Sequence, residues 1–183
     1  MGLDMSVNRK TYVKNWDHMA PEEKHTITIE GPKAKNIKPK RIEYIIEDMM
    51  YWRKANAIHK WFVDHVQDGE DKCQESYIPT EKLKELYKIC KTVLANSELV
   101  DGQVQNGAKL TPMGMEAIMQ DGKKIKDATV AGMLLPTEEG FFFGSTDYDQ
   151  YYYQDIEDTA KWLEELFKEP DWDRESYYYQ ASW

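Results

Sequence analysis

The stretch of sequence that most constrains the fold is Tyr51-Trp-Arg-Lys-Ala-Asn-Ala-Ile-His-Lys-Trp-Phe62, which holds two tryptophans, three cationic side chains and a histidine. Its apolar residues recur at three- and four-residue spacing, the period of one face of an α-helix. The pattern therefore predicts a long helix from Ile42 to about Val66, and it leaves open a short strand through residues 44–46 before that helix. The predicted inward face consists of Trp52, Ala55, His59, Phe62 and Val66.

Two more amphipathic helices are predicted further along the chain. One begins at Pro79-Thr80, with the Thr80 side chain as its N-cap. The other spans residues 149–168, and a short helix capped by Asp127 and stopped by Pro136 precedes it. The predicted inward residues of the two long helices are Leu83, Leu86, Tyr87, Cys90, Val93 and Leu94, and then Tyr152, Ile156, Thr159, Leu163 and Phe167.

Four segments have the composition of β-strands: residues 3–13, 25–30, 75–78 and 175–183. The second contains Thr26-Ile-Thr-Ile29, where β-branched side chains alternate as they do in a half-buried strand. The last is rich in tyrosine, and we consider both an ordinary paired strand and an edge strand open to a partner. Gly140-Phe-Phe-Phe-Gly144 predicts a buried strand or a tight loop.

Residues 96–126 lose the helical period and contain the turn-forming pairs Asp101-Gly102, Asn106-Gly107 and Asp121-Gly122. We interpret this segment as a hairpin-like surface insertion. The remaining elements predict an α+β fold, in which a small antiparallel sheet is covered by about three helices. At 183 residues the chain fits a single domain, residues 1–183.

The charge of the chain is unevenly distributed. Residues 1–60 carry twelve Lys and Arg against eight Asp and Glu, whereas residues 61–183 carry twelve against twenty-five. Because sequence-independent nucleic-acid binding requires clustered cations, the whole-chain charge of −9 disfavours it. The acidic half is either a solvated surface that keeps the protein in solution or a face that binds a basic partner.

Neither a membrane-spanning segment nor a disulfide framework is expected. No stretch approaches the roughly 20 apolar residues that span a bilayer, and the first residues lack the layout of a signal peptide. The two cysteines, Cys73 and Cys90, favour a cytosolic setting.

Two aromatic and charged segments form the candidate recognition surface, residues 51–62 and residues 134–153. Arginine presents a planar fork to phosphate or carboxylate groups, and tryptophan presents a stacking face. We expect the two segments to lie side by side, because the cations of the first half need anionic partners. The candidate binding residues are Trp52, Arg53, Lys54, Asn56, His59, Lys60 and Trp61, together with Asp147, Tyr148, Tyr151 and Tyr152. For each of them a purely structural role is the alternative.

The sequence offers no catalytic or metal-binding signature. The four histidines do not have the spacing of a zinc site, and the acidic run at residues 68–71 is too short for an EF-hand loop. Phosphate-binding and nucleophile motifs are also missing. We therefore expect no cofactor and no metal, and catalytic residues cannot be assigned.

Several segments resemble a family of small bacteriophage and prophage proteins. The matching segments are Met1-Gly-Leu-Asp-Met5, Thr11-Tyr-Val-Lys-Asn-Trp16, Tyr51-Trp-Arg-Lys-Ala-Asn-Ala-Ile-His59, Leu134-Leu-Pro-Thr137 and Gly140-Phe-Phe-Phe-Gly144. The resemblance covers nearly the whole chain except residues 96–126, and Ser6 departs from it where a tyrosine is expected. It implies a phage gene product in the cytoplasm of a bacterial host, and it supplies no catalytic residues.

These observations lead to two expectations of different classes. The first is a non-enzymatic phage protein that binds a host protein, such as an inhibitor of a host defence system. The alternative is a binder of an anionic small molecule, a nucleotide or phosphate compound, and an enzyme ranks third. The sequence leaves the oligomeric state open.

Overall fold

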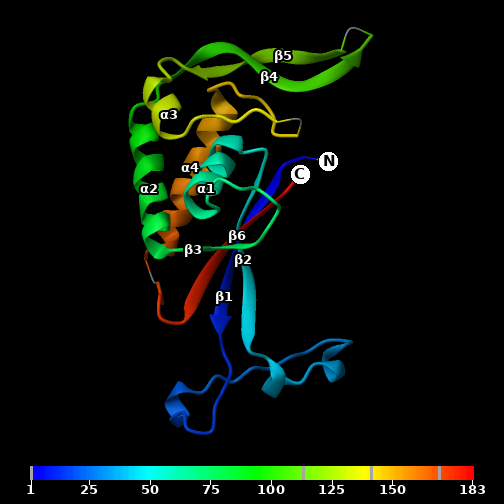
Figure 1. Ribbon diagram of the computed structural model, residues 1–183, viewed down its shortest axis with the longest axis vertical. Coiled ribbons are helices and arrows are strands. Elements are labelled where there is room, and N and C mark those ends of the chain that lie inside the picture. The colour runs from blue at the N-terminus through cyan, green and yellow to red at the C-terminus, as the bar shows by residue number, and fades with distance from the viewer. Residues whose placement is uncertain (1, 113, 141, 169) are drawn as a thin grey trace.

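A computed structural model describes residues 2–112, 114–140, 142–168 and 170–183, and it confirms the α+β class (Figure 1). Four strands form one antiparallel sheet in the order β2-β1-β6-β3, and two further strands form a separate hairpin. The described α-helices lie between the sheet and the hairpin (Figure 1). Within the described residues, no helix has both the length and the apolar character needed to cross a lipid bilayer.

The centre of the sheet is built from two strands at opposite ends of the chain, β1 (Asp4–Tyr12) and β6 (Glu175–Ser182). Alternate residues of both strands face the helices, so that Met5 and Val7 of β1 lie opposite the buried Ala181 and Tyr179 of β6. The short β3 (Ser76–Ile78) flanks β6 on its other side. The alternative of β6 as an open edge strand is therefore wrong, because β1 pairs with one of its edges and β3 pairs with the other over Tyr177–Tyr179.

The prediction of one long helix from Ile42 to about Val66 is wrong for the first half of that segment. Residues Tyr44–Arg53 form β2, which pairs with β1, and α1 covers only Asn56–Val66. Branched and aromatic side chains favour a strand here, and pairing with β1 supplies the backbone hydrogen bonds. Trp52 still faces inward because it lies on the buried face of β2, so its spacing from His59 only imitates a helical period.

The other helices lie close to the bounds predicted from the sequence. α2 spans Thr80–Ala95, α3 spans Thr129–Leu134 and α4 spans Gln150–Leu166. The predicted inward faces of α2 and α4 are confirmed. Most of the predicted residues are buried, namely Leu83, Leu86, Cys90, Val93, Tyr152, Ile156, Thr159 and Leu163. The other three, Tyr87, Leu94 and Phe167, are partly buried and pack against the core. Thr80 is not an N-cap, because Pro79 occupies that position and Thr80 is the first helical residue. The Asp127 carboxylate accepts a hydrogen bond from the Thr129 amide at 2.9 Å, although Ala128 holds the cap position of α3.

Residues 13–43 leave the sheet between β1 and β2 and extend beyond the helices (Figure 1). The strand predicted at residues 25–30 is absent, because this segment has no neighbouring strand with which to pair. The excursion instead contains three short 3-10 helices, Pro21–Glu23, Ala34–Asn36 and Pro39–Arg41, and none of them has a buried residue.

The predicted insertion is a β-hairpin formed by β4 (Leu99–Thr111) and β5 (Gly114–Ile125). It reverses between Thr111 and Gly114, so the three predicted turn pairs lie within the strands instead. Gly107 has φ of +113° at a register shift, where its backbone conformation accommodates a bulge. The base of the hairpin is more than a surface insertion, since Val104 is fully buried.

Candidate functional site

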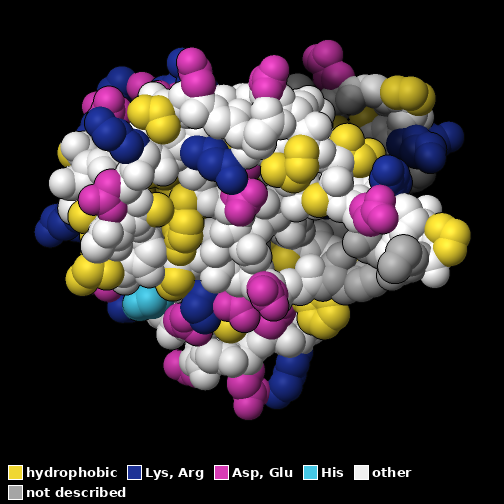
Figure 2. All heavy atoms as spheres, turned by 90° about the horizontal axis from the view of Figure 1, so that it is seen from above, with side chains coloured by type: hydrophobic (Ala, Val, Ile, Leu, Met, Phe, Trp, Pro, Cys, Tyr) yellow, Lys and Arg dark blue, Asp and Glu magenta, His cyan; other side chains and the backbone are white. Residues whose placement is uncertain are grey.

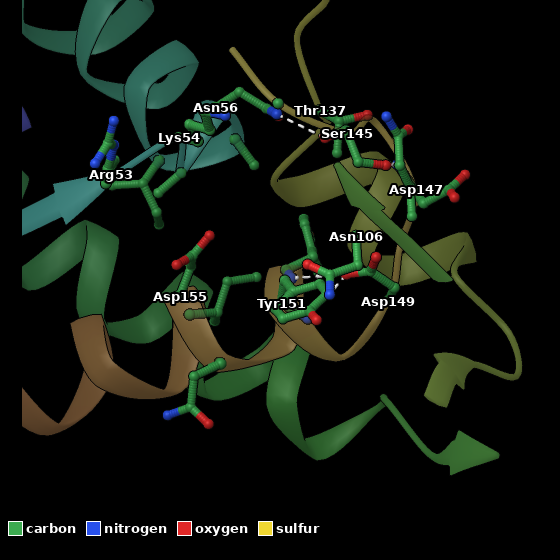
Figure 3. A pocket seen from close by; sticks show the side chains of 18 of the residues that line it. Arg53, Lys54, Asn56, Asn106, Thr137, Ser145, Asp147, Asp149, Tyr151 and Asp155 are labelled. Atoms are coloured by element: carbon green, nitrogen blue, oxygen red, sulfur yellow. Dashed lines mark hydrogen bonds between the residues drawn. The ribbon is translucent and has the colours of Figure 1, made fainter. Parts of the chain in front are cut away.

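A pocket of about 500 Å³ opens between the β2–α1 junction, the β4 bulge, the loop that precedes α4 and the first turns of α4 (Figure 3). Its walls bring Arg53 and Lys54 together with Asp147, Asp149 and Asp155. The close-up view places Arg53 and Lys54 at one side with Asp155 below these two cations, and Asp147 and Asp149 at the other side (Figure 3). The two sequence segments that we expected to be neighbours thus meet at one cavity, although Arg53 ends a strand rather than lying on a helix.

The cationic wall depends on an unusual backbone conformation at Lys54. This residue has φ of +63°, in the left-handed region that non-glycine residues rarely adopt. Its amide donates to the Leu3 carbonyl oxygen at 2.7 Å, and its carbonyl accepts from the Asn56 amide at 2.8 Å. A methyl group at Gly144 would lie only 3.1 Å from the Lys54 Cβ, so the glycine gives the lysine stem room to enter the pocket wall. Such strain concentrates at functional sites.

Both cations are available for a ligand. The Arg53 side chain is 60% exposed, and its Nε lies 3.8 Å from the Asp4 carboxylate, which is too long for a hydrogen bond. Among the described residues, Lys54 forms no ion pair. Two positive charges therefore lie at the end of β2 beside the cavity, one in a long ion pair with Asp4 and the other in no ion pair with a described residue.

Asn56 fixes the loop that forms the upper wall. Its side-chain amide donates to the carbonyl oxygens of Phe143 and Ser145 at 3.0 and 2.8 Å, and its Oδ1 accepts from the Glu138 amide at 3.1 Å. The side chain is 4% exposed. Asn56 thus supports the pocket, and these three bonds leave it little capacity to bind a ligand directly.

Asp149 joins the N-terminus of α4 to the pocket. Its Oδ1 accepts from the amides of Tyr151 and Tyr152 at 2.8 and 3.1 Å, as an N-cap does. Its Oδ2 is buried and has no hydrogen-bond partner among the described residues. Burial raises the pKa of this carboxyl, against the lowering effect of the two amides. The free oxygen can accept a hydrogen bond from a donor that enters the cavity.

Asp155 lies further along α4 and is half-buried in the pocket floor. Burial, and then the nearby carboxylates of Asp158 and Asp149, raise its pKa to about 7. Near neutral pH both protonation states are populated, so this side chain can accept or donate a hydrogen bond. Asp147, on the far wall, has its carboxylate 3.8 Å from Lys124 Nζ.

Four of the predicted binding residues have mainly structural surroundings. His59 is 2% exposed, with Nδ1 2.7 Å from the Tyr179 hydroxyl and Nε2 3.1 Å from Asp71, and burial lowers its pKa despite that carboxylate. The Trp52 indole donates to Thr159 Oγ1 at 2.8 Å. Trp61 is buried, and Lys60 is held by Glu138 at 2.9 Å and Asp64 at 3.2 Å. None of the four lines the cavity.

The three predicted tyrosines differ in their exposure. Tyr151 is 42% exposed and lines the pocket, and its hydroxyl accepts from the Gln120 amide at 3.0 Å. Tyr152 also lines the pocket, but its ring is buried and its hydroxyl donates to the Leu135 carbonyl oxygen at 2.9 Å. Tyr148 packs against Tyr152 with ring centroids 4.9 Å apart and lies behind the wall.

Asp155 and the β4 bulge at residues 105–108 both line the pocket, and neither is among the binding residues predicted from the sequence. Asp155 lies four residues after Tyr151, one turn along the same helical face, and that spacing was a usable signal. The bulge has no distinct sequence signal, because the pair Asn106-Gly107 is equally typical of a turn.

No described group of three or more His, Cys, Asp or Glu side chains converges as a metal site would require. Phe141 of the Gly140–Gly144 segment lies outside the described residues, and the described part of that segment is a loop. The chain matches no family model, no curated protein and no solved structure in the three comparisons made with known proteins.

Proposed function

We propose that this protein is a binding protein for a small anionic molecule, a nucleotide or a phosphate compound, which occupies the pocket between the β2–α1 junction and α4. The observation that carries the proposal is the pair Arg53 and Lys54 on the wall of the pocket, where Arg53 has only a long ion pair of 3.8 Å with Asp4 and Lys54 has none with a described residue. A phosphate or carboxylate group placed there gains charge-assisted hydrogen bonds from the arginine fork and the lysine ammonium.

The floor and the opposite wall of the pocket supply complementary acceptors. The free oxygen of Asp149 and the carboxyl of Asp155 accept hydrogen bonds from N–H groups, such as those on a nucleobase. The exposed ring of Tyr151 offers a face on which a planar group can stack. A volume of about 500 Å³ lies within the range of small-molecule pockets, roughly 300–1,000 Å³.

Titration calorimetry with adenosine and guanosine 5′-monophosphates, their nucleosides and inorganic phosphate tests the proposal. We expect a nucleotide to bind more tightly than its nucleoside, because only the nucleotide reaches the two cations. Arg53→Ala with Lys54→Ala should abolish that difference and leave the melting temperature nearly unchanged. The matched control is Lys84→Ala with Lys88→Ala, which removes two exposed charges from α2. Equal binding by the pocket variant and the wild-type protein would contradict the proposal.

A second candidate is a phage protein that binds a host protein in the bacterial cytoplasm, as an inhibitor of host defence would. The hairpin favours it, because Leu110, Ile118 and Met119 are 82%, 45% and 47% exposed. Seen from the hairpin end, hydrophobic side chains are interspersed with charges of both signs (Figure 2), and the exposed apolar side chains supply contact area for a partner. Recovery of one host protein by the wild type but not by a Leu110→Ser, Ile118→Ser variant would support this function, and equal recovery by both would count against it.

A further inference from the structure

Residues 14–43 form an arm that stands apart from the core, at the end of the sheet away from the hairpin (Figure 1). Every residue from 14 to 43 is described, and none of them is buried. The arm is held at its base by the Val13 amide, which donates to the Glu43 carbonyl oxygen at 2.9 Å. Paired hydrogen bonds of 2.8 Å between Asn15 and His25 hold its first half. Its side chains are therefore not needed for the core.

The second half of the arm is strongly cationic. Five Lys and Arg residues lie between Gly31 and Ile42 with no Asp or Glu among them. All five side chains are exposed, and none forms an ion pair with a described residue. These residues, which we call the basic loop, are Lys33, Lys35, Lys38, Lys40 and Arg41. The 3-10 turns Ala34–Asn36 and Pro39–Arg41 hold its backbone in a defined path.

The two carboxylates Glu43 and Glu47 after the basic loop are already engaged elsewhere, whereas Glu30, directly before it, is exposed and forms no ion pair with a described residue. Glu43 pairs with Lys14, and Glu47 pairs with Arg9 at 2.8 Å. The excess negative charge of the chain lies in residues 61–183, which form the helices, the hairpin, β3 and β6. The whole-chain charge therefore does not describe the field at the arm, where positive charge predominates over one short loop.

A connected group of aromatic rings adjoins the basic loop. Tyr44 follows Arg41 by three residues, is 52% exposed and packs on Tyr12 at 5.2 Å. The Tyr12 hydroxyl accepts a hydrogen bond from the Trp16 indole at 2.7 Å, and Trp16 is 47% exposed. Trp16 in turn stacks on His18 at 6.5 Å. Lys14 Nζ also lies 4.7 Å from the centroid of the Trp16 ring. The remaining exposed surface of Trp16 and the exposed ring of Tyr44 offer area on which unpaired bases can stack.

We propose that the arm binds single-stranded nucleic acid, with the phosphates on the basic loop and bases stacked on Trp16 and Tyr44. Exposed cations beside aromatic rings are the two components of such surfaces. A lipid surface fits less well, because Ile45 and Ile46 are successive residues of β2 and point to opposite faces. Their side chains cannot enter a bilayer together. This site is separate from the pocket, and its test is independent of the pocket ligand.

Fluorescence anisotropy of a labelled 20-nucleotide oligothymidylate, titrated with the full chain, measures the binding. With three to five phosphate contacts, affinity should fall about 20-fold to about 130-fold between 50 and 200 mM salt, since each contact adds about −0.7 to the logarithmic salt slope. Substituting alanine for Lys33, Lys35 and Lys38 should weaken binding at least about tenfold at 50 mM salt and flatten that slope. Trp16→Ala should weaken binding without changing the slope.

The charge-matched control substitutes alanine for Lys84, Lys88 and Lys91, which are exposed on α2. This control should bind like the wild-type protein, and equal losses in both triple variants would overturn the proposal. No binding at 50 mM salt would also overturn it. Equal competition by polyglutamate of the same charge would reassign the arm to an acidic protein partner. Because no arm residue is buried, unchanged melting temperatures serve as the check on folding.

Discussion

Replacing Asp155 by asparagine should change how the stability of the protein depends on pH. The folded protein raises the pKa of this carboxyl from 3.8 to about 7, mainly by burial. The folded state therefore holds the proton more tightly than the unfolded chain does. The resulting stabilisation is fully present below the unfolded pKa and is lost as pH rises through about 7. Asparagine has no proton to lose, so the variant should lack this component.

The size of the effect follows from the two pKa values. Between pH 5 and pH 8 the difference in proton binding corresponds to about 2.5 kcal/mol, at about 1.36 kcal/mol for each pKa unit. Asp155 is only half-buried, and water at the pocket mouth screens the ionised form. We therefore expect the free energy of unfolding of the wild type to fall by about 1–2.5 kcal/mol more than that of the variant over this range. At pH 8 the variant should be the more stable protein.

Urea unfolding followed by tryptophan fluorescence at pH 5, 6, 7 and 8 measures this difference directly. The matched control is Asp17→Asn, which removes an exposed carboxylate from the arm and should reproduce the pH dependence of the wild type. Parallel curves for the wild type and the Asp155→Asn variant would refute the reasoning, because they would show that the carboxyl ionises equally easily in both states.

Three further changes test the packing around the pocket. Phe62→Ala should lower the free energy of unfolding by about 3–5 kcal/mol, because the side chain is fully buried and its ring stacks on Tyr179 at 4.1 Å; a wild-type melting temperature would contradict this. Asn56→Ala should cost about 2–3 kcal/mol, because it removes three hydrogen bonds to the pocket loop, and unchanged amide hydrogen exchange in residues 138–145 would contradict that role. Deleting residues 108–118 leaves Asn106-Gly107 as a two-residue turn between the paired Gln105 and Met119, so cooperative melting should persist, and aggregation would show that the hairpin end supports the core.

The helical faces of α2 and α4 could be predicted because each helix buries one stripe of residues along its whole length. The boundary between β2 and α1 could not be predicted from the sequence. Met49 and Met50 suit a helix as well as a strand, and the chain changes from one to the other at Lys54, a lysine with positive φ. Such a conformation is common for glycine and asparagine, and no local signal marks it at lysine. The preference of residues 44–53 for a strand is decided by the pairing with β1, which is remote in sequence.

Only part of the candidate site could be predicted from the sequence, because tertiary pairing again decides which residues face the cavity. Sequence proximity placed Arg53 and Lys54 in one group with Trp52 and His59, but β2 and α1 turn the latter pair into the core. A hydrogen bond of 2.8 Å from Trp52 to Thr159 of α4 could not be foreseen from either segment alone. Only the tertiary arrangement separates residues that face the cavity from neighbours that support it.

Because β6 lies between β1 and β3, the sheet cannot be completed on the ribosome until residues 175–182 have been synthesised. β1 and β2 can pair early, but β3 has no partner strand before then, and the apolar faces of α1 and α2 lack their finished support. Closing a loop of this length costs entropy before the strand contacts form. The nascent chain therefore exposes Phe62 and the other core side chains for most of its synthesis, and it should depend on chaperones that bind apolar segments during translation.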